Sequence, residues 1–177
     1  MSVASASKWI YAAYVAEKRA GLLSETDVKF LHFPSGYISF DAFRSCGLAD
    51  TVDSCLNNGR NGDYTASSDG KFNYDGGHMQ KHASLDGLGG MNSVALAAEV
   101  RRLLGTDIAL SYSQPQLAGG VVTTAADYAR FLRKVLGNSL RMNAMLGADA
   151  VCTNPTNCSL AVATPTPRGE NWMYSMG

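Results

Sequence analysis

Residues 5–16 of the chain read SASKWIYAAYVA, and they predict the central helix of the domain. From Ser7 to Ala20 the residues are good helix formers, and Gly21 follows where helices commonly end. Apolar or small side chains cover most of the circumference of this helix, which is typical of a helix buried in the middle of a protein. We therefore expect the start of the helix to lie deep in a cleft.

The first four residues of this stretch place a hydroxyl and an amine three positions apart. On one face of a helix start, Lys8 can accept the proton of Ser5 and so activate it as a nucleophile. The pattern is short, and a serine at a helix start is usually only a cap. The motif therefore predicts chemistry only in combination with other parts of the chain.

Composition limits the class of protein and of partner. Of the 177 residues, 46% are hydrophobic and 17% charged, which suits one globular domain with a sizeable core. The 15 basic residues balance 15 acidic ones, so neither nucleic acid nor an anionic membrane surface is favoured as a partner. No apolar run reaches the ~20 residues that span a bilayer, and the first residues lack the pattern of a signal peptide. A small neutral or amphiphilic ligand is expected.

Four cysteines form two local pairs, Cys46 with Cys55 and Cys152 with Cys158. Neither pair has the spacing of a zinc or redox site, so two short-loop disulfides compete with four buried thiols. We expect the disulfides, and with them a periplasmic or secreted location. Free thiols would instead indicate the cytoplasm.

Two further helices are predicted with defined ends. Residues 93–104 carry apolar side chains at helical spacing, and Asn92 or Ser93 can cap their start. The strongest helical pattern begins at Thr124, with Asp127 three residues later as in a capping box, and ends at Gly137-Asn138.

The remaining segments are less periodic. Turn-forming residues dominate 22–70, which we expect to form loops with short helices. The other expected elements are a short helix around 48–56, a linker between the two longer helices, a helical piece at 139–146, an extended loop over 147–170 and an unfinished β-strand at 171–177.

A tyrosine and two histidines are candidates for chemistry. Tyr74 precedes Gly76-Gly77 on a predicted tight turn, where a phenol can serve in proton transfer, although packing of the loop is the simpler role. His78 and His82 stand four residues apart, a spacing that can hold a metal on a helix, but no third ligand of comparable context follows. No metal and no cofactor are therefore expected.

Four stretches, in this order, resemble the serine β-lactamase and penicillin-binding protein superfamily, in particular its class C-like branch with serine esterases and D-amino-acid peptidases. Ser5-Ala6-Ser7-Lys8 fits the nucleophile motif, and residues 31–37, LHFPSGY, fit the "LLxHTSGL"-like loop. Residues 72–78, FNYDGGH, fit the stretch that holds the catalytic tyrosine. Residues 117–132, LAGGVVTTAADYARFL, fit the "AGGLxSTAxDxARF" segment, which is the longest and most specific of the four.

The resemblance implies an α+β, β-lactamase/transpeptidase-like fold and a role for individual residues. Ser5 would be the acyl-forming nucleophile, Lys8 its proton acceptor and Tyr74 the acid/base partner of the leaving group. The backbone N–H of Ser5 would supply half of the oxyanion hole. Further positions that the resemblance places at the substrate are Gly76, His78, Gly119 and Gly120.

Two departures from the family pattern matter. Gly76 stands where the tyrosine motif usually has Asn, which favours an esterase over a β-lactamase. The chain also lacks the Lys-Thr-Gly or His-x-Gly strand and much of the central antiparallel sheet. We therefore expect residues 1–177 to form one incomplete domain that carries mainly the helical part. One face of the central helix would stay uncovered until a complementary chain or a homo-oligomer completes the sheet.

The leading hypothesis for function is a serine hydrolase acting as a carboxylesterase on small esters. A β-lactamase or D-amino-acid peptidase, hydrolysing an amide, is the alternative within the same chemistry. An alternative of a different class is a non-catalytic fragment or subunit that needs a second chain, which the missing third motif favours.

Overall fold

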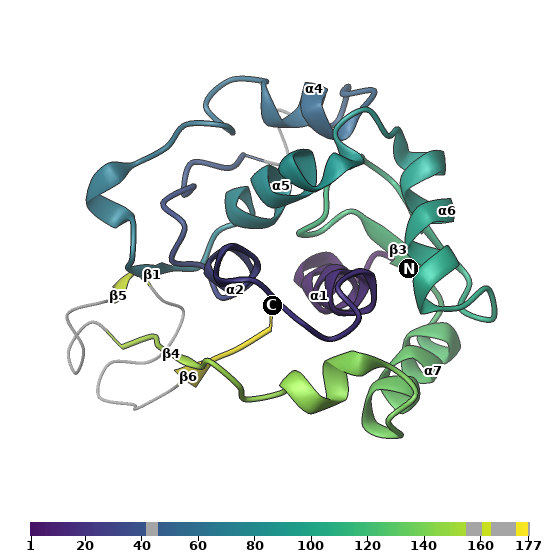
Figure 1. The fold of residues 1–177 in the computed structure, drawn as a ribbon. Helices are drawn as coiled ribbons and strands as arrows, with labels where there is room; N and C mark the ends of the chain where they lie inside the picture. Colours follow the sequence, from purple (N-terminus) through teal and green to yellow (C-terminus); the bar gives the residue numbers. More distant parts are fainter. Residues whose placement is uncertain (42–45, 155–160, 164–172, 177) are drawn as a thin grey trace.

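Helix α1 (Ser7–Lys18) lies at the centre of the computed structural model, which describes residues 1–41, 46–154, 161–163 and 173–176 (Figure 1). The other α-helices of the described residues lie around it. They are α2 (Glu25–Leu31), α4 (Val52–Leu56), α5 (Gly77–Ala83), α6 (Ser93–Leu104) and α7 (Ala125–Leu136). Single helical turns are η1 (Ala4–Ala6), η2 (Ala66–Ser68), the π-helical η3 (Ser84–Leu88) and η4 (Arg141–Met145).

The two longest predicted helices after α1 are confirmed, and their caps explain why they begin where the sequence predicts. The Asn92 side chain accepts hydrogen bonds from two backbone N–H groups at the start of α6. The Thr124 hydroxyl accepts the N–H of Asp127 at the start of α7. Both caps satisfy donors that a helix start otherwise leaves unpaired, so the local sequence is enough to define these boundaries.

Shorter helices were harder to predict. The helical pieces expected around 48–56 and 139–146 are present as the shorter elements α4 and η4. Helices α2 and α5 have seven residues each, which is too few for a clear periodic pattern. The start of α2 is nevertheless fixed by a capping box between Ser24 and Asp27.

Strand pairing in the described residues is limited to short pieces. Strands β2 (Leu110–Tyr112) and β3 (Val121–Thr123) are antiparallel, with Leu110 opposite Thr123. The other pairs are β1 (Phe72–Asn73) with β5 (Ala161–Ala163), parallel, and β4 (Val151–Cys152) with β6 (Met173–Tyr174), antiparallel. The α+β class is therefore confirmed.

Four strands correct the sequence prediction. The expected linker between α6 and α7 contains β2 and β3, and the extended loop expected over 147–170 contains β4 and β5. Within that loop, residues 155–160 and 164–170 lie outside the described part of the chain. Strand β6 falls inside the strand expected at 171–177.

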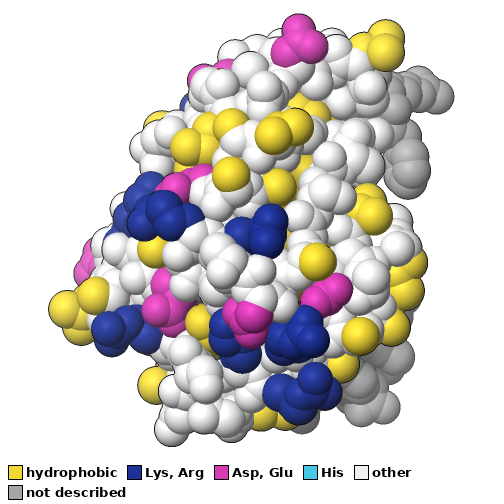
Figure 2. Space-filling model, turned by 90° about the vertical axis from the view of Figure 1, so that its right-hand side faces the viewer, with side chains coloured by type: hydrophobic (Ala, Val, Ile, Leu, Met, Phe, Trp, Pro, Cys, Tyr) yellow, Lys and Arg dark blue, Asp and Glu magenta, His cyan; other side chains and the backbone are white. Residues whose placement is uncertain are grey.

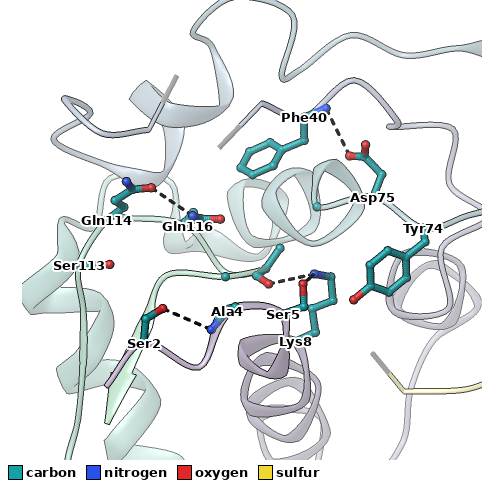
Figure 3. A pocket seen from close by; sticks show the side chains of 13 residues that line it. Ser2, Ala4, Ser5, Lys8, Phe40, Tyr74, Asp75, Ser113, Gln114 and Gln116 are labelled. Carbon is teal, nitrogen blue, oxygen red and sulfur yellow. Dashed lines mark hydrogen bonds between the residues drawn. The ribbon is translucent and has the colours of Figure 1, made fainter. Parts of the chain in front are cut away.

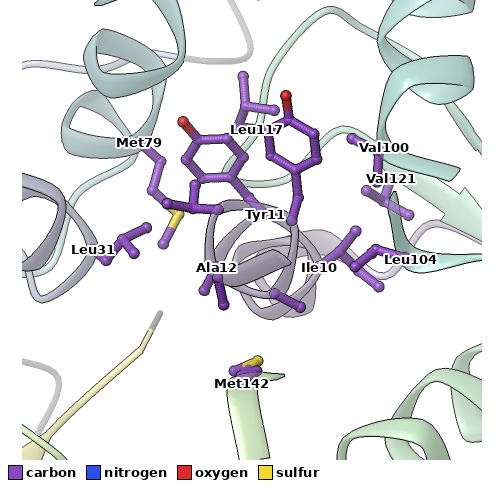
Figure 4. Packing of buried hydrophobic residues seen from close by; sticks show 14 of the residues in the cluster. Ile10, Tyr11, Ala12, Leu31, Met79, Val100, Leu104, Leu117, Val121 and Met142 are labelled. Carbon is purple, nitrogen blue, oxygen red and sulfur yellow. The ribbon is translucent and has the colours of Figure 1, made fainter. Parts of the chain in front are cut away.

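The core surrounds α1 on several sides (Figure 4). Every residue from Ile10 to Ala16 is at most 1% exposed. The residues that cover this helix include Leu31 of α2, Met79 of α5, Val100 and Leu104 of α6, Val121 of β3, Met142 of η4 and Leu117 of the loop before β3. The expectation that one face of the central helix stays uncovered is therefore wrong, because other elements of the same chain bury it.

Acidic and basic side chains are interspersed on the face over α6 and α7, which Figure 2 turns toward the viewer. Local ion pairs account for much of this pattern: Arg102 with Glu99, Arg130 with Asp127, and Lys134 with Asp107. Among the described helices, none is long and apolar enough to cross a membrane.

Candidate active site

A pocket of about 430 Å³ opens at the N-terminal end of α1 (Figure 3). Its walls come from residues 2–8, from the loop at 74–76, from residues 113–119 and from Phe40. The short turn η1 and the start of α1 thus meet loops that are distant in sequence. This arrangement brings Ser5, Lys8 and Tyr74 together, as the resemblance implied.

The hydroxyl and the amine of the predicted nucleophile pair are in contact. Ser5 lies on η1 at the exposed mouth of the pocket, just before α1, whereas Lys8 is on the first turn of α1 and only 3% exposed. The Lys8 Nζ donates to the Ser5 Oγ at 3.2 Å and to the backbone oxygen of Ala118 at 2.9 Å. The Ala118 carbonyl therefore anchors the amine beside the hydroxyl.

Burial tunes this amine for proton transfer. Burial lowers the pKa of Lys8 to about 8, although the negative charge of Asp75 raises it in part. A buried amine with such a pKa is partly neutral near physiological pH, so its lone pair can accept the serine proton.

Asp75 is an ionisable group of this pocket that was not among the predicted site residues. Its Oδ1 accepts the N–H of Gly77 at 2.7 Å and the N–H of Phe40 at 3.3 Å. Burial raises the pKa of Asp75, while these two hydrogen bonds and the charge of Lys8 oppose the shift. In the sequence, the one feature that could have marked Asp75 as a pocket residue is its position next to Tyr74 in the same motif.

Ser7, the other serine of the motif, has a structural role. It is completely buried, its hydroxyl donates to the Ala4 backbone oxygen at 2.6 Å, and the same oxygen accepts the Val121 N–H at 3.1 Å. These bonds tie η1 to α1 and to strand β3. Ser7 Oγ is thus already occupied, and Ser5 is the serine that faces the pocket.

Tyr74 lies beside the pair. Its side chain is 37% exposed, and the Lys8 Nζ stands 4.9 Å from the centroid of its ring. Figure 3 shows the phenol hydroxyl on the side of Ser5 and Lys8. The ring therefore offers the charged form of Lys8 a cation–π contact.

The glycines of the predicted site differ in position. Gly76 and Gly119 line the pocket, whereas Gly120 does not. A Cβ on Gly120 would lie 2.6 Å from the backbone oxygens of Gln114 and Gln116, so this position needs glycine for the loop to close. A Cβ on Gly76 would lie 2.7 Å from the Phe40 ring, which therefore occupies the space of a larger residue.

His78, which the resemblance placed at the substrate, lies outside the pocket lining. It is fully buried on α5, its Nε2 donates to the Asn73 carbonyl at 2.9 Å, and its Nδ1 accepts the Ser35 hydroxyl at 2.6 Å. Burial lowers the pKa of His78 to about 4. His82, four residues on, contacts Tyr11 and Asp27 instead, so the two histidines serve different networks.

A buried glutamine on α5 holds one wall of the pocket. The Gln80 amide donates to the carbonyls of Val52 and Pro115, and its oxygen accepts the Leu117 N–H. The loop at 113–119 brings Ser113, Gln114 and Gln116 to the pocket, and none of these was predicted. The polar residues that flank Pro115 gave no pattern that distinguishes a pocket wall from an ordinary loop.

The structure joins Cys46 and Cys55 in a disulfide, as expected. Cys158, the expected partner of Cys152, lies outside the described residues. The described residues that line the pocket all lie between Ser2 and Gly119, and neither residue of β4 is among them.

Comparison of the chain with protein-family profiles, with curated proteins and with solved structures found no match. Fold and site therefore define the chain as an α+β protein with a serine hydroxyl against a buried amine at the mouth of a pocket. Any narrower assignment depends on the chemistry of these residues.

Proposed function

We propose that the chain is a serine hydrolase that forms an acyl-enzyme on Ser5 and acts as a carboxylesterase on small esters. The observation that carries the proposal is the buried Lys8 amine, 3.2 Å from the Ser5 Oγ. Burial lowers the pKa of this amine to about 8, so it is a base of suitable strength. The adjoining space of about 430 Å³ has room for a small ester.

Each step follows from these groups. Neutral Lys8 takes the Ser5 proton, the Oγ attacks the ester carbonyl carbon, and the bond to the alcohol oxygen breaks. The leaving alkoxide receives the proton from Lys8 or through Tyr74. Water then attacks the acyl-serine, which releases the acid and returns the proton to Ser5. The Ala118 carbonyl holds the amine in place throughout.

An ester is favoured over an amide by the pocket wall at Gly76 and Phe40. At Gly76 no side-chain amide is available to bind a substrate amide, and the Phe40 ring fills that space. The uncharged lining residues of the pocket include both serine and glutamine side chains. The central position of the Ser-x-x-Lys helix is compatible with a β-lactamase/transpeptidase-like fold, and we include that fold in the proposal.

Covalent labelling tests the nucleophile. A fluorophosphonate probe should modify Ser5, identified by peptide mass spectrometry, and Ser5→Ala should abolish the label. Ser7→Ala is the matched control: it removes a hydroxyl two residues away and should keep the label if the protein still folds. A label found on Ser7, or no label on protein whose circular dichroism shows it folded, contradicts the assignment.

Turnover tests the substrate class. The chain should hydrolyse a p-nitrophenyl ester of a short acyl chain and leave a chromogenic cephalosporin intact. Faster opening of the cephalosporin would instead indicate the β-lactamase alternative. Folded protein that hydrolyses neither compound would indicate the non-catalytic alternative.

Two further expectations come from the sequence. The Cys46–Cys55 bond supports a periplasmic or secreted location. A complementary chain or homo-oligomer stays a prediction of the resemblance, because the burial of α1 does not require one. Size-exclusion chromatography with mass detection tests this prediction, since an active species of 18.8 kDa would contradict it.

A further inference from the structure

A second pocket, of about 250 Å³, lies at the opposite end of α1 from Ser5. Its walls come from the loop after α1, the end of α2, the end of η4 and the last described residues; Figure 1 shows that end of the chain beside α2. Apolar side chains form most of the lining: Leu22, Leu23, Met145, Ala148 and Met176. The other described residues of the lining are Gly21, His32 and Asp149. We call this space the His32 pocket, and none of its described lining residues also lines the pocket at Ser5.

His32, which lines this pocket, carries a buried nitrogen that lacks a partner. His32 is 1% exposed, and its Nδ1 lies 2.8 Å from the backbone oxygen of Asp149. A carbonyl can only accept, so the Nδ1 carries the hydrogen and the Nε2 presents a lone pair. That Nε2 is buried and has no hydrogen-bond partner in the described part of the chain. Buried polar atoms of this kind are rare, because leaving them unpaired costs free energy.

Burial keeps this acceptor in its neutral form. It lowers the pKa of His32, although the Asp149 carbonyl and carboxylate oppose the shift. The Nε2 is therefore an acceptor at neutral pH, and the partner that it lacks is a hydrogen-bond donor. The two methionines at the wall can adapt to the shape of such a guest.

We propose that the His32 pocket binds a small neutral molecule with an apolar body and one hydroxyl group, whose O–H donates to the His32 Nε2. The apolar lining accounts for the body, and the unpartnered nitrogen accounts for the hydroxyl. An anion is disfavoured because Asp149 stands at the wall, and an ammonium group is disfavoured because the Nε2 is buried. The volume suits a ligand of the size of a substituted phenol or a medium-chain alcohol.

Three probes of similar size separate the hydroxyl from the apolar body. We expect p-cresol to bind, and toluene and 4-methylanisole to bind about tenfold more weakly, because neither has a donor. Titrations followed by ¹⁵N NMR of the histidine rings report the contact directly. The His32 Nε2 resonance should move with p-cresol. The rings of His78 and His82 are internal controls, since both nitrogens of each already have partners.

A variant tests the same contact from the protein side. His32→Phe keeps an aromatic ring and removes the acceptor, so p-cresol should lose its advantage over toluene. Equal affinity of the three probes for the unaltered protein would overturn the proposal, even if the variant fails to fold. Unchanged His32 resonances with all three probes at millimolar concentration would also overturn it, and would leave water as the occupant.

Discussion

Lys8 is the residue on which the proposed activity depends. Only its neutral form can accept the Ser5 proton, and burial lowers its pKa to about 8. The rate of ester hydrolysis should therefore rise as the pH increases through about 8 and then level off. A pH profile of kcat/KM for a short-chain ester checks this, and a rate that is flat from pH 6 to 10 would exclude Lys8 as the base.

Asp75 provides a sharper test of the same residue. Its negative charge raises the pKa of Lys8, so Asp75→Asn should lower that pKa and move the rising limb of the profile to lower pH. The matched control is Asp63→Asn, which removes the same charge from an exposed pair with Arg60. This control should leave the limb in place. A shift to higher pH in Asp75→Asn would contradict the assigned interaction.

At the scale of elements, Gln80 links α5 to the loop that forms one pocket wall. In Gln80→Leu, the carbonyls of Val52 and Pro115 and the N–H of Leu117 lose their partner. Buried and unpaired, these groups should lower the free energy of unfolding by about 1–3 kcal/mol. Urea unfolding measures this loss. Gln114→Leu is the control, because the Gln114 side chain bonds only to Gln116 in the contacts described for it, and should cost less.

Asp27 joins three helices through one buried carboxylate. It accepts hydrogen bonds from Arg19 after α1, from Ser24 at the cap of α2 and from His82 on α5. Burial disfavours its charged form, but these hydrogen bonds outweigh burial and hold the pKa of Asp27 well below its usual value of 3.8. The carboxylate therefore stabilises the fold above that pH, and the contribution is lost as the pH falls below it.

Removing this charge should cost stability in a pH-dependent way. We expect Asp27→Asn to lower the free energy of unfolding by about 2–3 kcal/mol at pH 7, a range typical of hydrogen bonds to a charged group. The difference from the unaltered protein should shrink as the pH falls toward 2. Unfolding curves at pH 7, 4 and 3 provide the measurement, and a difference that grows toward low pH would contradict this role.

The elements that could be predicted are those whose ends are encoded locally. Asn92 and Thr124 cap α6 and α7 through side chains that are visible in the sequence. Strands β2 and β3 have three residues each, and their pairing depends on a loop that folds back over Gly120. Such contacts between distant residues leave no periodic signal, so this part of the fold required the structure.

At the scale of the molecule, the site also combines contacts that local sequence predicts with contacts between distant segments that it does not. Ser5 and Lys8 are one helical turn apart, so their contact follows from local geometry. Asp75, Gln114 and Gln116 reach the pocket from two other segments, and nothing in their local sequence marks them as neighbours of Ser5. The uncovered face expected for α1 was wrong for a related reason: helices α2, α5 and α6 cover it, although sequence reasoning assigned that role to a sheet.

The disulfide between Cys46 and Cys55 stabilises the molecule as a whole by restricting its unfolded chain. The bond links residues nine positions apart, so its loss should lower the free energy of unfolding by about 2–3 kcal/mol. A reductant would act on every disulfide in the protein, and the double variant Cys46→Ala/Cys55→Ala isolates this one. Urea unfolding of that variant without reductant is the measurement.

Cavity formation must be separated from loss of the cross-link, because both cysteines are completely buried. In a background that carries Cys152→Ala and Cys158→Ala, reduced protein keeps the sulfur atoms of Cys46 and Cys55 and loses only their bond. If the cross-link stabilises the protein, the reduced protein and the double variant should both have a lower free energy of unfolding than the oxidised protein. The value for the double variant should be the lowest, because that variant also contains cavities. A reduced protein as stable as the oxidised one would show that packing around the sulfurs, rather than the shorter unfolded chain, holds this region together.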